Sequence, residues 1–236
     1  MSSRPAPPPP RAPGEPLARP RDAATLIVYR GKAGSLEVLM GERHARHRFM
    51  PNRYVFPGGR IDPRDSRVRC ASPLAPAAAA QLGRKLGPAR ARAMAVAAIR
   101  ETFEETGLII GGPDPEPERP PPRGWERFFG AGFAPAPGAL SYLARAVTPP
   151  TRPIRFNARF FVVAHAHVTG EARESDELLG LKWFTVEQAL TLELALITRR
   201  VLTHFGTSFA TAARGDARSP VPYFKWTPGG HVLIDE

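Results

Sequence analysis

The stretch from Arg100 to Leu108, with the sequence Arg-Glu-Thr-Phe-Glu-Glu-Thr-Gly-Leu, constrains the fold of this chain more than any other. Its pattern predicts a helix from about residue 89 to residue 106, ended by Gly107. One side of this helix is an apolar stripe made by Val96, Ile99 and Phe103. Another side carries three carboxylates at positions i, i+3 and i+4, which belong to Glu101, Glu104 and Glu105. One face therefore packs in a core while another presents acids.

The three glutamates repel one another in the absence of a cation. Like charges at these spacings destabilise a helix by roughly 0.2–0.5 kcal/mol per pair, and acids near the helix end also face the negative end of its dipole. A hard divalent cation such as Mg²⁺ would reverse both effects, because it prefers carboxylate oxygens and stays partly hydrated, which leaves room for a phosphate. Arg100 can pair with Glu104 one turn further on and orient it. The helix therefore predicts a metal site beside a phosphate.

A second motif, Phe56-Pro57-Gly58-Gly59, lies upstream, and its glycines let the backbone approach a metal or a phosphate closely. Together the two motifs resemble the signature of the Nudix hydrolases, G-x5-E-x7-R-E-U-x-E-E-x-G-U, in which U is apolar. Asp65 stands where that family has its first Glu. The family places seven residues between this acid and the arginine, whereas 34 lie between Asp65 and Arg100, so the motif contains an insertion of 27 residues.

The resemblance implies an α/β fold, the Nudix-type α/β/α sandwich with a central mixed sheet. It also implies that water attacks a diphosphate joined to another moiety, with Mg²⁺ or Mn²⁺ as cofactor and a small nucleoside diphosphate derivative as substrate. The residues that it assigns to the metal and to catalysis are Glu101, Glu104, Glu105, Arg100 and the carbonyl of Gly59. In such proteins a later acid can serve as base or extra ligand, so Glu174 and Glu177 are candidates, with a solvated turn as the alternative. The sequence leaves open whether the chain forms a homodimer.

The basic segment before the glycines resembles the coenzyme A diphosphatase branch of this family, whose signature is L-L-T-x-R-(S/A)-x3-R-x3-G-x3-F-P-G-G. Leu39, Arg43 and Arg48 match it in register, and the long insertion is similar to the peroxisomal members. The positions that depart from it are Met40, Gly41, His44 and Asn52. This resemblance implies that Arg43, Arg48 and Phe49 bind the substrate. A solvated basic loop is the alternative interpretation of the segment.

Coenzyme A carries a 3′-phosphate beside its diphosphate, and Arg43, Arg46 and Arg48 could bind that charge with paired hydrogen bonds. The expected products are 3′,5′-ADP and 4′-phosphopantetheine, or its acyl form from an acyl-CoA. Three other substrate classes stay open, namely ADP-ribose, nucleotide sugars and dinucleoside polyphosphates. A module of another class, which senses a nucleotide without turnover, is a further alternative.

The composition suggests that the protein could bind nucleic acid, because the formal net charge is +11 and the pI is near 10.9. The pattern argues against it, since 29 of the 33 basic residues are arginines scattered among Ala and Pro, with no block of five or six like charges. The lone cysteine, Cys70, suits a reducing compartment. No apolar run reaches 18 residues and no secretory signal is seen, so we expect a soluble cytoplasmic protein without a membrane span.

The chain divides into a Pro-rich disordered tail over residues 1–20 and one Nudix hydrolase domain over 21–236, with the insertion at about 66–88. We expect the insertion to be a surface excursion that a short linker could replace. Residues 111–124, which are rich in Pro, are expected to be a flexible loop. The strands and helices expected beside the acidic helix cover residues 25–29, 36–40, 108–110, 156–168, 181–184, 192–209, 221–226 and 231–234.

Overall fold

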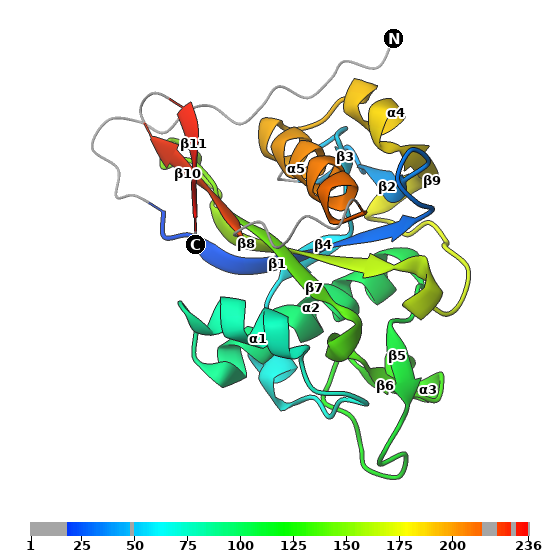
Figure 1. Ribbon diagram of the computed structural model, residues 1–236. Coiled ribbons are helices and arrows are strands. Elements are labelled where there is room, and N and C mark those ends of the chain that lie inside the picture. The colour runs from blue at the N-terminus through cyan, green and yellow to red at the C-terminus, as the bar shows by residue number, and fades with distance from the viewer. Residues whose placement is uncertain (1–17, 48–49, 214–220, 228–229, 236) are drawn as a thin grey trace.

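The structure is a computed structural model that describes residues 18–47, 50–213, 221–227 and 230–235. Its centre is a mixed sheet of nine strands (Figure 1). In spatial order the main path contains β11 (Gly230–Asp235), β10 (Pro222–Thr227), β7 (Ser141–Val147), β8 (Phe156–Ala164), β1 (Arg21–Arg30), β2 (Glu37–Arg43) and β3 (Tyr54–Val55). Two more strands complete the sheet, β4 (Gly58–Arg60) beside β1 and β9 (Leu178–Thr185) beside β2.

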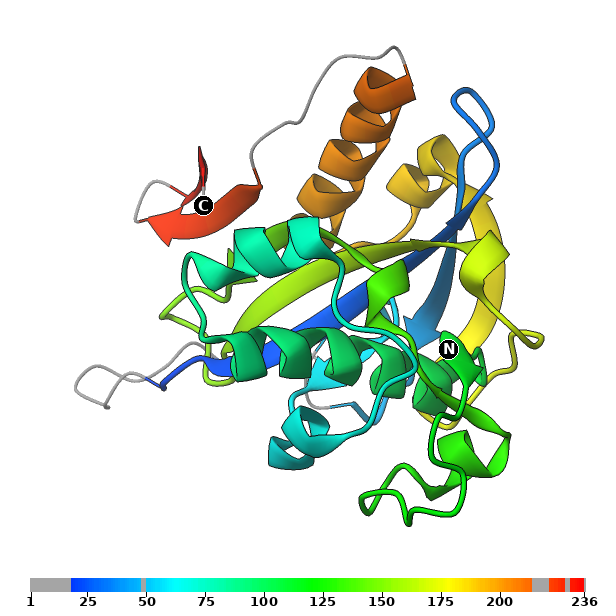
Figure 2. The ribbon, with the colours of Figure 1, turned by 60° about the horizontal axis from the view of Figure 1, so that its bottom comes forward.

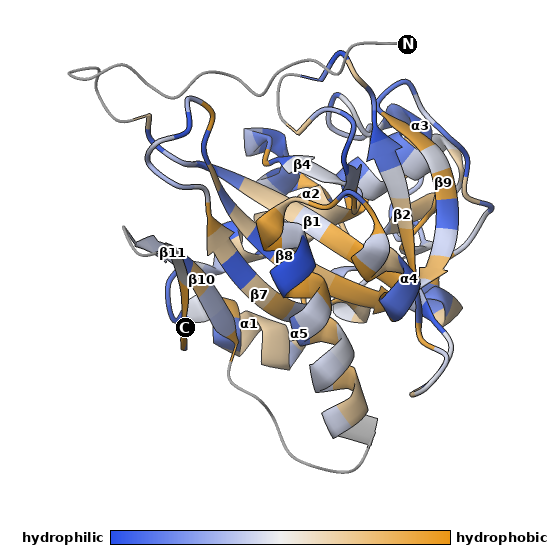
Figure 3. Cartoon of the chain, turned by 90° about the horizontal axis from the view of Figure 1, so that it is seen from above, coloured by the Kyte–Doolittle hydropathy of each residue, from blue (hydrophilic) through white to orange (hydrophobic). Residues whose placement is uncertain are grey.

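Strand β1 holds the middle of this sheet together. It forms an antiparallel hairpin with β2, in which Tyr29 lies opposite Val38, and it runs parallel to β8 over most of its length. Its first half pairs with β4, where Ala24 lies opposite Gly59. The Gly58-Gly59 motif is therefore fixed to the central strand. In Figure 3 the hydrophobic colour is concentrated along β1 and β8 in the middle of the molecule.

Helices cover both faces of the sheet, because side chains along each strand alternate between two cores. Leu26 and Val28 of β1 join the core beneath α1 (Pro76–Gly83), α2 (Pro88–Thr106) and α3 (Glu126–Gly130). Ile27 joins the opposite core, beneath α4 (Val186–Thr191) and α5 (Leu196–Ala213). Figures 1 and 2 show these helices on the two sides of the sheet. The predicted α/β/α sandwich with a central mixed sheet is confirmed.

Helix α2 matches the predicted acidic helix closely. It begins with Pro88 as its first residue, a position where the missing N–H of proline costs nothing. It ends at Gly107, which has φ 73° and donates its N–H to the carbonyl of Phe103 at 2.8 Å. Val96 and Ile99 are fully buried. The apolar stripe therefore anchors the helix to the sheet and fixes the direction in which its acids point.

The insertion is not the surface excursion that the sequence suggested. Val68, Ala78 and Leu82 are buried in the same core cluster as α2, and helix α1 packs directly against α2. Arg92 of α2 also donates hydrogen bonds to the carbonyls of Ser66 and Val68. The expectation failed because α1 buries only two of its eight residues, too few to give a clear apolar stripe in the sequence.

We expect Leu82→Ala to lower the free energy of unfolding by about 2–4 kcal/mol, because it opens a cavity in the core. Urea unfolding measures this change. Lys85→Ala, an exposed position of the same segment, should change it by less than about 0.5 kcal/mol. Equal and small effects of the two substitutions would restore the interpretation of the insertion as a surface excursion.

Two further expectations need correction. Residues 108–110 do not form a strand, since only Ile109 makes a bridge, to Thr169. The segment 111–124 is not wholly a loop, because β5 (Gly111–Pro113) pairs with β6 (Phe133–Pro135) in a separate small sheet. Asp114 then receives two hydrogen bonds from Arg69, at 2.8 and 2.6 Å. Contacts between distant residues, which no local pattern reports, thus fix this segment.

Among the helices of the described residues, none has both the length and the hydropathy that a membrane span requires.

Candidate active site

Arg100 is the centre of an ion-pair network at the C-terminal half of α2. Its Nη1 lies 2.7 Å from Oε1 of Glu101 and donates to Oε2 of Glu104 at 3.2 Å. Its Nε and Nη2 donate to the two carboxylate oxygens of Asp65 at 3.0 and 3.2 Å, and Nη2 also reaches the carbonyl of Arg60 at 2.9 Å. Burial by itself would lower the pKa of Arg100, but the hydrogen bonds that it donates to Asp65 and the charges of the three acids raise it. The arginine therefore stays charged and holds the acids in place.

Asp65 belongs to this network and not to the acidic face of α2. Its side chain is fully buried, and it accepts hydrogen bonds from Arg100, from the N–H of Asp62 at 2.9 Å and from Nε1 of Trp125 at 3.3 Å. The short helix η1 (Pro63–Arg67) places it there. Despite the insertion, the acid in the position of the family's first Glu thus meets the arginine of the second motif.

Glu101 lies directly against the backbone of Gly59. A Cβ at position 59 would collide with the Glu101 carboxylate, so only glycine allows this approach. Burial raises the pKa of Glu101 to about 7, with the charge of Arg100 opposing the shift and that of Glu104 adding to it. The carboxylate of Glu101 and the backbone of Gly59 are therefore close enough to bind the same ion or ligand.

Glu105 is the most buried of the three glutamates, with its side chain 5% exposed. Its Oε2 accepts a hydrogen bond from the N–H of Gly58 at 2.9 Å, and its Oε1 lies 3.9 Å from Nη2 of Arg43. Burial raises the pKa of Glu105 to about 8, and the charges of Glu101 and Glu177 raise it further, while Arg43 and Gly58 oppose the shift. A buried carboxylate in this environment favours a positive partner.

The three glutamates open onto an acidic hollow of about 900 Å³. The loop before β9 forms its other wall with Glu171, Glu174, Asp176 and Glu177. His47 pairs with Glu177 through Nε2 and Oε2 at 3.0 Å, which links the basic segment after β2 to this acidic loop. Both late acids that the sequence proposed as base or extra ligand, Glu174 and Glu177, therefore face the same hollow as the glutamates of α2.

The donor set of the hollow fits a divalent cation of the Mg²⁺ type. Carboxylate oxygens and a backbone carbonyl are the ligands that this ion prefers, and Mg²⁺ is usually held by one or two carboxylates together with waters and substrate phosphates. Within the described ranges, no three acidic, histidine or cysteine side chains are arranged so that they could hold a metal ion by themselves. The residues that would hold the ion are Glu101, Glu104, Glu105 and Gly59, with water and a phosphate completing the shell.

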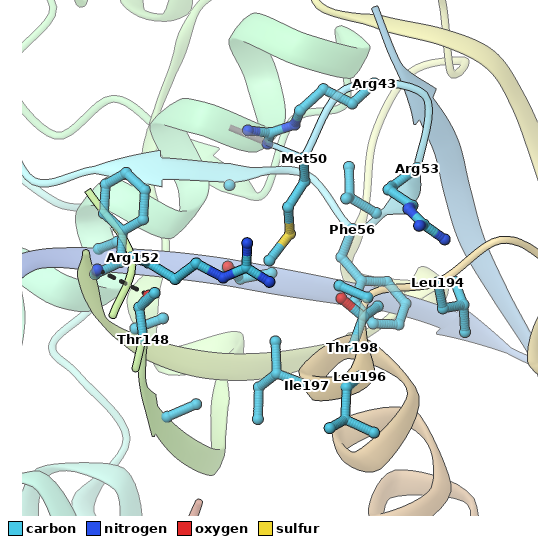
Figure 4. A pocket seen from close by; sticks show the side chains of 18 of the residues that line it. Arg43, Met50, Arg53, Phe56, Thr148, Arg152, Leu194, Leu196, Ile197 and Thr198 are labelled. Carbon is cyan, nitrogen blue, oxygen red and sulfur yellow. Dashed lines mark hydrogen bonds between the residues drawn. The ribbon is translucent and has the colours of Figure 1, made fainter. Parts of the chain in front are cut away.

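A second cavity, also of about 900 Å³, lies beside the glycine motif (Figure 4). Gly58 and Gly59 belong to its lining, so the cavity continues from the backbone that touches Glu101 and Glu105. Most of its remaining wall is apolar and comes from β3, β8, the start of α5 and the loop after β7, with Val55, Phe56, Phe160, Leu194, Leu196 and Ile197 among its residues. A flat apolar group of a ligand could therefore occupy it while its phosphates reach the acidic hollow.

Three arginines line this cavity, and only Arg43 was among the predicted substrate-binding residues. Arg48 and Phe49 lie outside the described residues. Arg46 is exposed and is not part of the lining. The sequence analysis missed Arg53 and Arg152. Arg53 stands at a variable position of the quoted signature, between Asn52 and Phe56, and Arg152 belongs to no motif. The only local signal for Arg152 is that it is the single arginine among the prolines at residues 149–153.

The chain is similar to a Nudix hydrolase from Alicyclobacillus acidocaldarius. The two share 30% sequence identity and a TM-score of 0.64, over 80% of this chain and 91% of that one. The chain therefore belongs to the Nudix hydrolase family, and its class is that of a Nudix pyrophosphohydrolase, as the sequence predicted. No family model and no curated protein matches the sequence.

Two further solved structures are more distant. A C. elegans Ap4A hydrolase binary complex has 17% identity and a TM-score of 0.43, over 80% of this chain and 98% of that one. The NUDIX domain of Shewanella oneidensis NrtR complexed with ADP ribose has 11% identity and a TM-score of 0.47, over 81% of this chain and 89% of that one.

We expect Gly59→Ala to lower kcat by about a hundredfold, because the new methyl group displaces Glu101, and misplacing a catalytic group by about 1 Å can cost that much. Initial rates on a nucleoside diphosphate derivative with Mg²⁺ measure the effect. Gly83→Ala is the matched control, since a Cβ there meets nothing within 4 Å. Full activity of the Gly59 variant would show that the contact between Gly59 and Glu101 has no catalytic role.

Proposed function

We propose that this enzyme hydrolyses a diphosphate that joins a nucleoside to another moiety, with coenzyme A or an acyl-CoA as its substrate. The products would be 3′,5′-ADP and 4′-phosphopantetheine or its acyl form. One observation carries the proposal: Glu101 and Glu105 of the acidic hollow contact the two glycines that line a cavity with three arginines and apolar walls. The acidic hollow would accommodate the diphosphate of the substrate, and the adjacent cavity would accommodate its nucleoside.

A bound Mg²⁺ or Mn²⁺ would neutralise the diphosphate and bring a water molecule to it. Glu101, Glu104 and Glu105 would hold the ion together with the carbonyl of Gly59. Arg100 would keep two of these acids in place through its contacts to Glu101 and Glu104. A base is needed to accept a proton from the attacking water, and Glu101, Glu174 and Glu177 are the candidates, because all three face the hollow.

The alternative substrates are ADP-ribose, nucleotide sugars and dinucleoside polyphosphates. The decisive test is a screen of diphosphate compounds with Mg²⁺ and with Mn²⁺, in which mass spectrometry identifies the products. Cleavage of coenzyme A to 3′,5′-ADP supports the proposal. Cleavage of ADP-ribose without cleavage of coenzyme A would move the assignment to the nucleotide-sugar class. A chain that binds nucleotides and turns over none of these compounds would be the sensing module.

Three sequence-based expectations also remain proposals. One is a cytoplasmic location, and another is a homodimer, which sedimentation of the purified chain would test. The third is the division into a tail over 1–20 and a domain over 21–236. Residues 1–17 lie outside the described part of the chain. A variant that begins at residue 18 should therefore unfold in urea like the full chain if the tail is independent of the domain.

A further inference from the structure

The second cavity is positively charged as well as apolar. Its lining contains Arg43, Arg53 and Arg152, and none of the described lining residues is an acid. The hollow next to it contains seven acids and two arginines. The divalent ions of the acidic hollow would balance a diphosphate there. These ions would not balance the charge of a further anionic group bound in the second cavity. The arginines of that cavity could balance this charge.

Two of these three arginines already have acidic partners. Nη2 of Arg43 lies 3.9 Å from Glu105, and Arg53 forms an ion pair with Glu193. Arg152 has no ion-pair partner among the described residues. In Figure 4 its guanidinium extends into the cavity between Met50 and Ile197. Arg152 is exposed to solvent, so a ligand can reach it. It is therefore the arginine whose charge is free for a substrate.

The loop that carries Arg152 is held in place by the strands on both sides. The N–H of Thr148 donates to the carbonyl of Phe156 at 2.9 Å, and the N–H of Phe156 donates to Oγ1 of Thr148 at 3.0 Å. The N–H of Arg152 itself reaches the carbonyl of Pro149 at 3.2 Å. Prolines at positions 149, 150 and 153 limit the backbone further. The backbone that carries the guanidinium is therefore held in a defined position, which lowers the entropy cost of ligand binding.

We propose that Arg152 binds a phosphate monoester on the nucleoside part of the substrate and makes the enzyme select nucleoside diphosphate derivatives that carry this additional phosphate. The proposal rests on the proposed function and adds a specificity residue to it. A planar guanidinium suits such a group because it can donate two parallel hydrogen bonds to one phosphate. The apolar wall beside it, which includes Phe56 and Ile197, would bind the nucleoside base.

The test uses binding of small phosphates by the full-length, metal-free protein, so it does not depend on turnover. Calorimetry compares adenosine 3′,5′-bisphosphate and adenosine 2′,5′-bisphosphate with AMP, which lacks the additional phosphate. We expect at least one bisphosphate to bind about tenfold or more tightly than AMP, the size of a charge-assisted pair of hydrogen bonds. Which of the two binds better identifies the position of the phosphate.

Arg152→Ala should remove this preference, and Arg152→Lys should keep part of it, because lysine retains the charge but loses the paired geometry. Arg123→Ala is the matched control, since it removes one positive charge from an exposed arginine outside the cavity and should leave the preference unchanged. Three results would overturn the proposal: equal binding of all three compounds by the wild-type protein, no measurable binding of any of them, or an unchanged preference in Arg152→Ala.

Hydrolysis separates the failure of this inference from the failure of the proposed function. With Mg²⁺, the wild-type enzyme should have a higher kcat/KM for coenzyme A than for dephospho-coenzyme A, and Arg152→Ala should reduce the ratio. If both are cleaved equally well, the role of Arg152 is wrong while the diphosphatase function stands. If no diphosphate compound is cleaved, the proposed function fails, and the binding experiment still decides whether Arg152 recognises the additional phosphate.

Discussion

Replacing Glu105 by Gln is expected to lower kcat/KM by at least about a hundredfold, and Glu104→Gln should have an effect of similar order, because each removes a ligand charge from the metal site. The fold should survive both changes. Gln at position 105 can still accept the hydrogen bond from the N–H of Gly58. Burial also favours the neutral form of this side chain and raises the pKa of Glu105 to about 8, so the neutral amide of Gln suits the same environment.

The experiment combines steady-state rates over a range of Mg²⁺ concentrations with thermal unfolding. An unchanged or slightly higher Tm together with a large loss of turnover would identify a functional role for Glu105. Glu116→Gln is a suitable control, since this acid is exposed, forms an ion pair with Arg119 and does not line the acidic hollow. Near-normal turnover of both Glu104→Gln and Glu105→Gln at saturating Mg²⁺ would remove the glutamates of α2 from the active site.

The sequence predicted the acidic helix well because all the relevant signals are local. Apolar spacing, an arginine one turn from a glutamate and a glycine at the end of the helix lie within twenty residues of one another. The contact between Gly59 and Glu101 spans more than forty residues. Only the paired motifs of a known family pointed to it. The local sequence pattern thus predicted the helix, and the resemblance to a known family predicted that the helix lies beside the glycines.

The parts that the sequence did not predict depend on tertiary packing. Helix α1 buries only Ala78 and Leu82, which no periodic pattern reveals in an Ala-rich segment. The two hydrogen bonds between Arg69 and Asp114 connect residues 45 positions apart and fix a stretch that its composition marks as a loop. Likewise, Arg152 reaches the cavity only because the loop between β7 and β8 folds next to α5. Single arginines in Pro-rich segments carry no such information by themselves.

The second large effect concerns the stability of the protein. We expect Arg100→Leu to lower the free energy of unfolding by about 3–5 kcal/mol, because it leaves the fully buried Asp65 without its charged partner. The remaining hydrogen bonds to Asp65, from the N–H of Asp62 and from Trp125, do not neutralise its charge. Urea unfolding of the purified variant at pH 7 measures the loss.

A double substitution shows whether the cost comes from the unpaired charge. Asp65→Asn combined with Arg100→Leu removes both charges and keeps the shape of the Asp65 side chain, so it should recover part of the stability that Arg100→Leu loses. Turnover should not recover, because Glu101 and Glu104 lose the arginine that contacts them both. If the double variant were as unstable as the sum of the single ones, Asp65 and Arg100 would act independently. Arg100 would then stabilise the fold mainly through its contacts to Glu101, Glu104 and the carbonyl of Arg60.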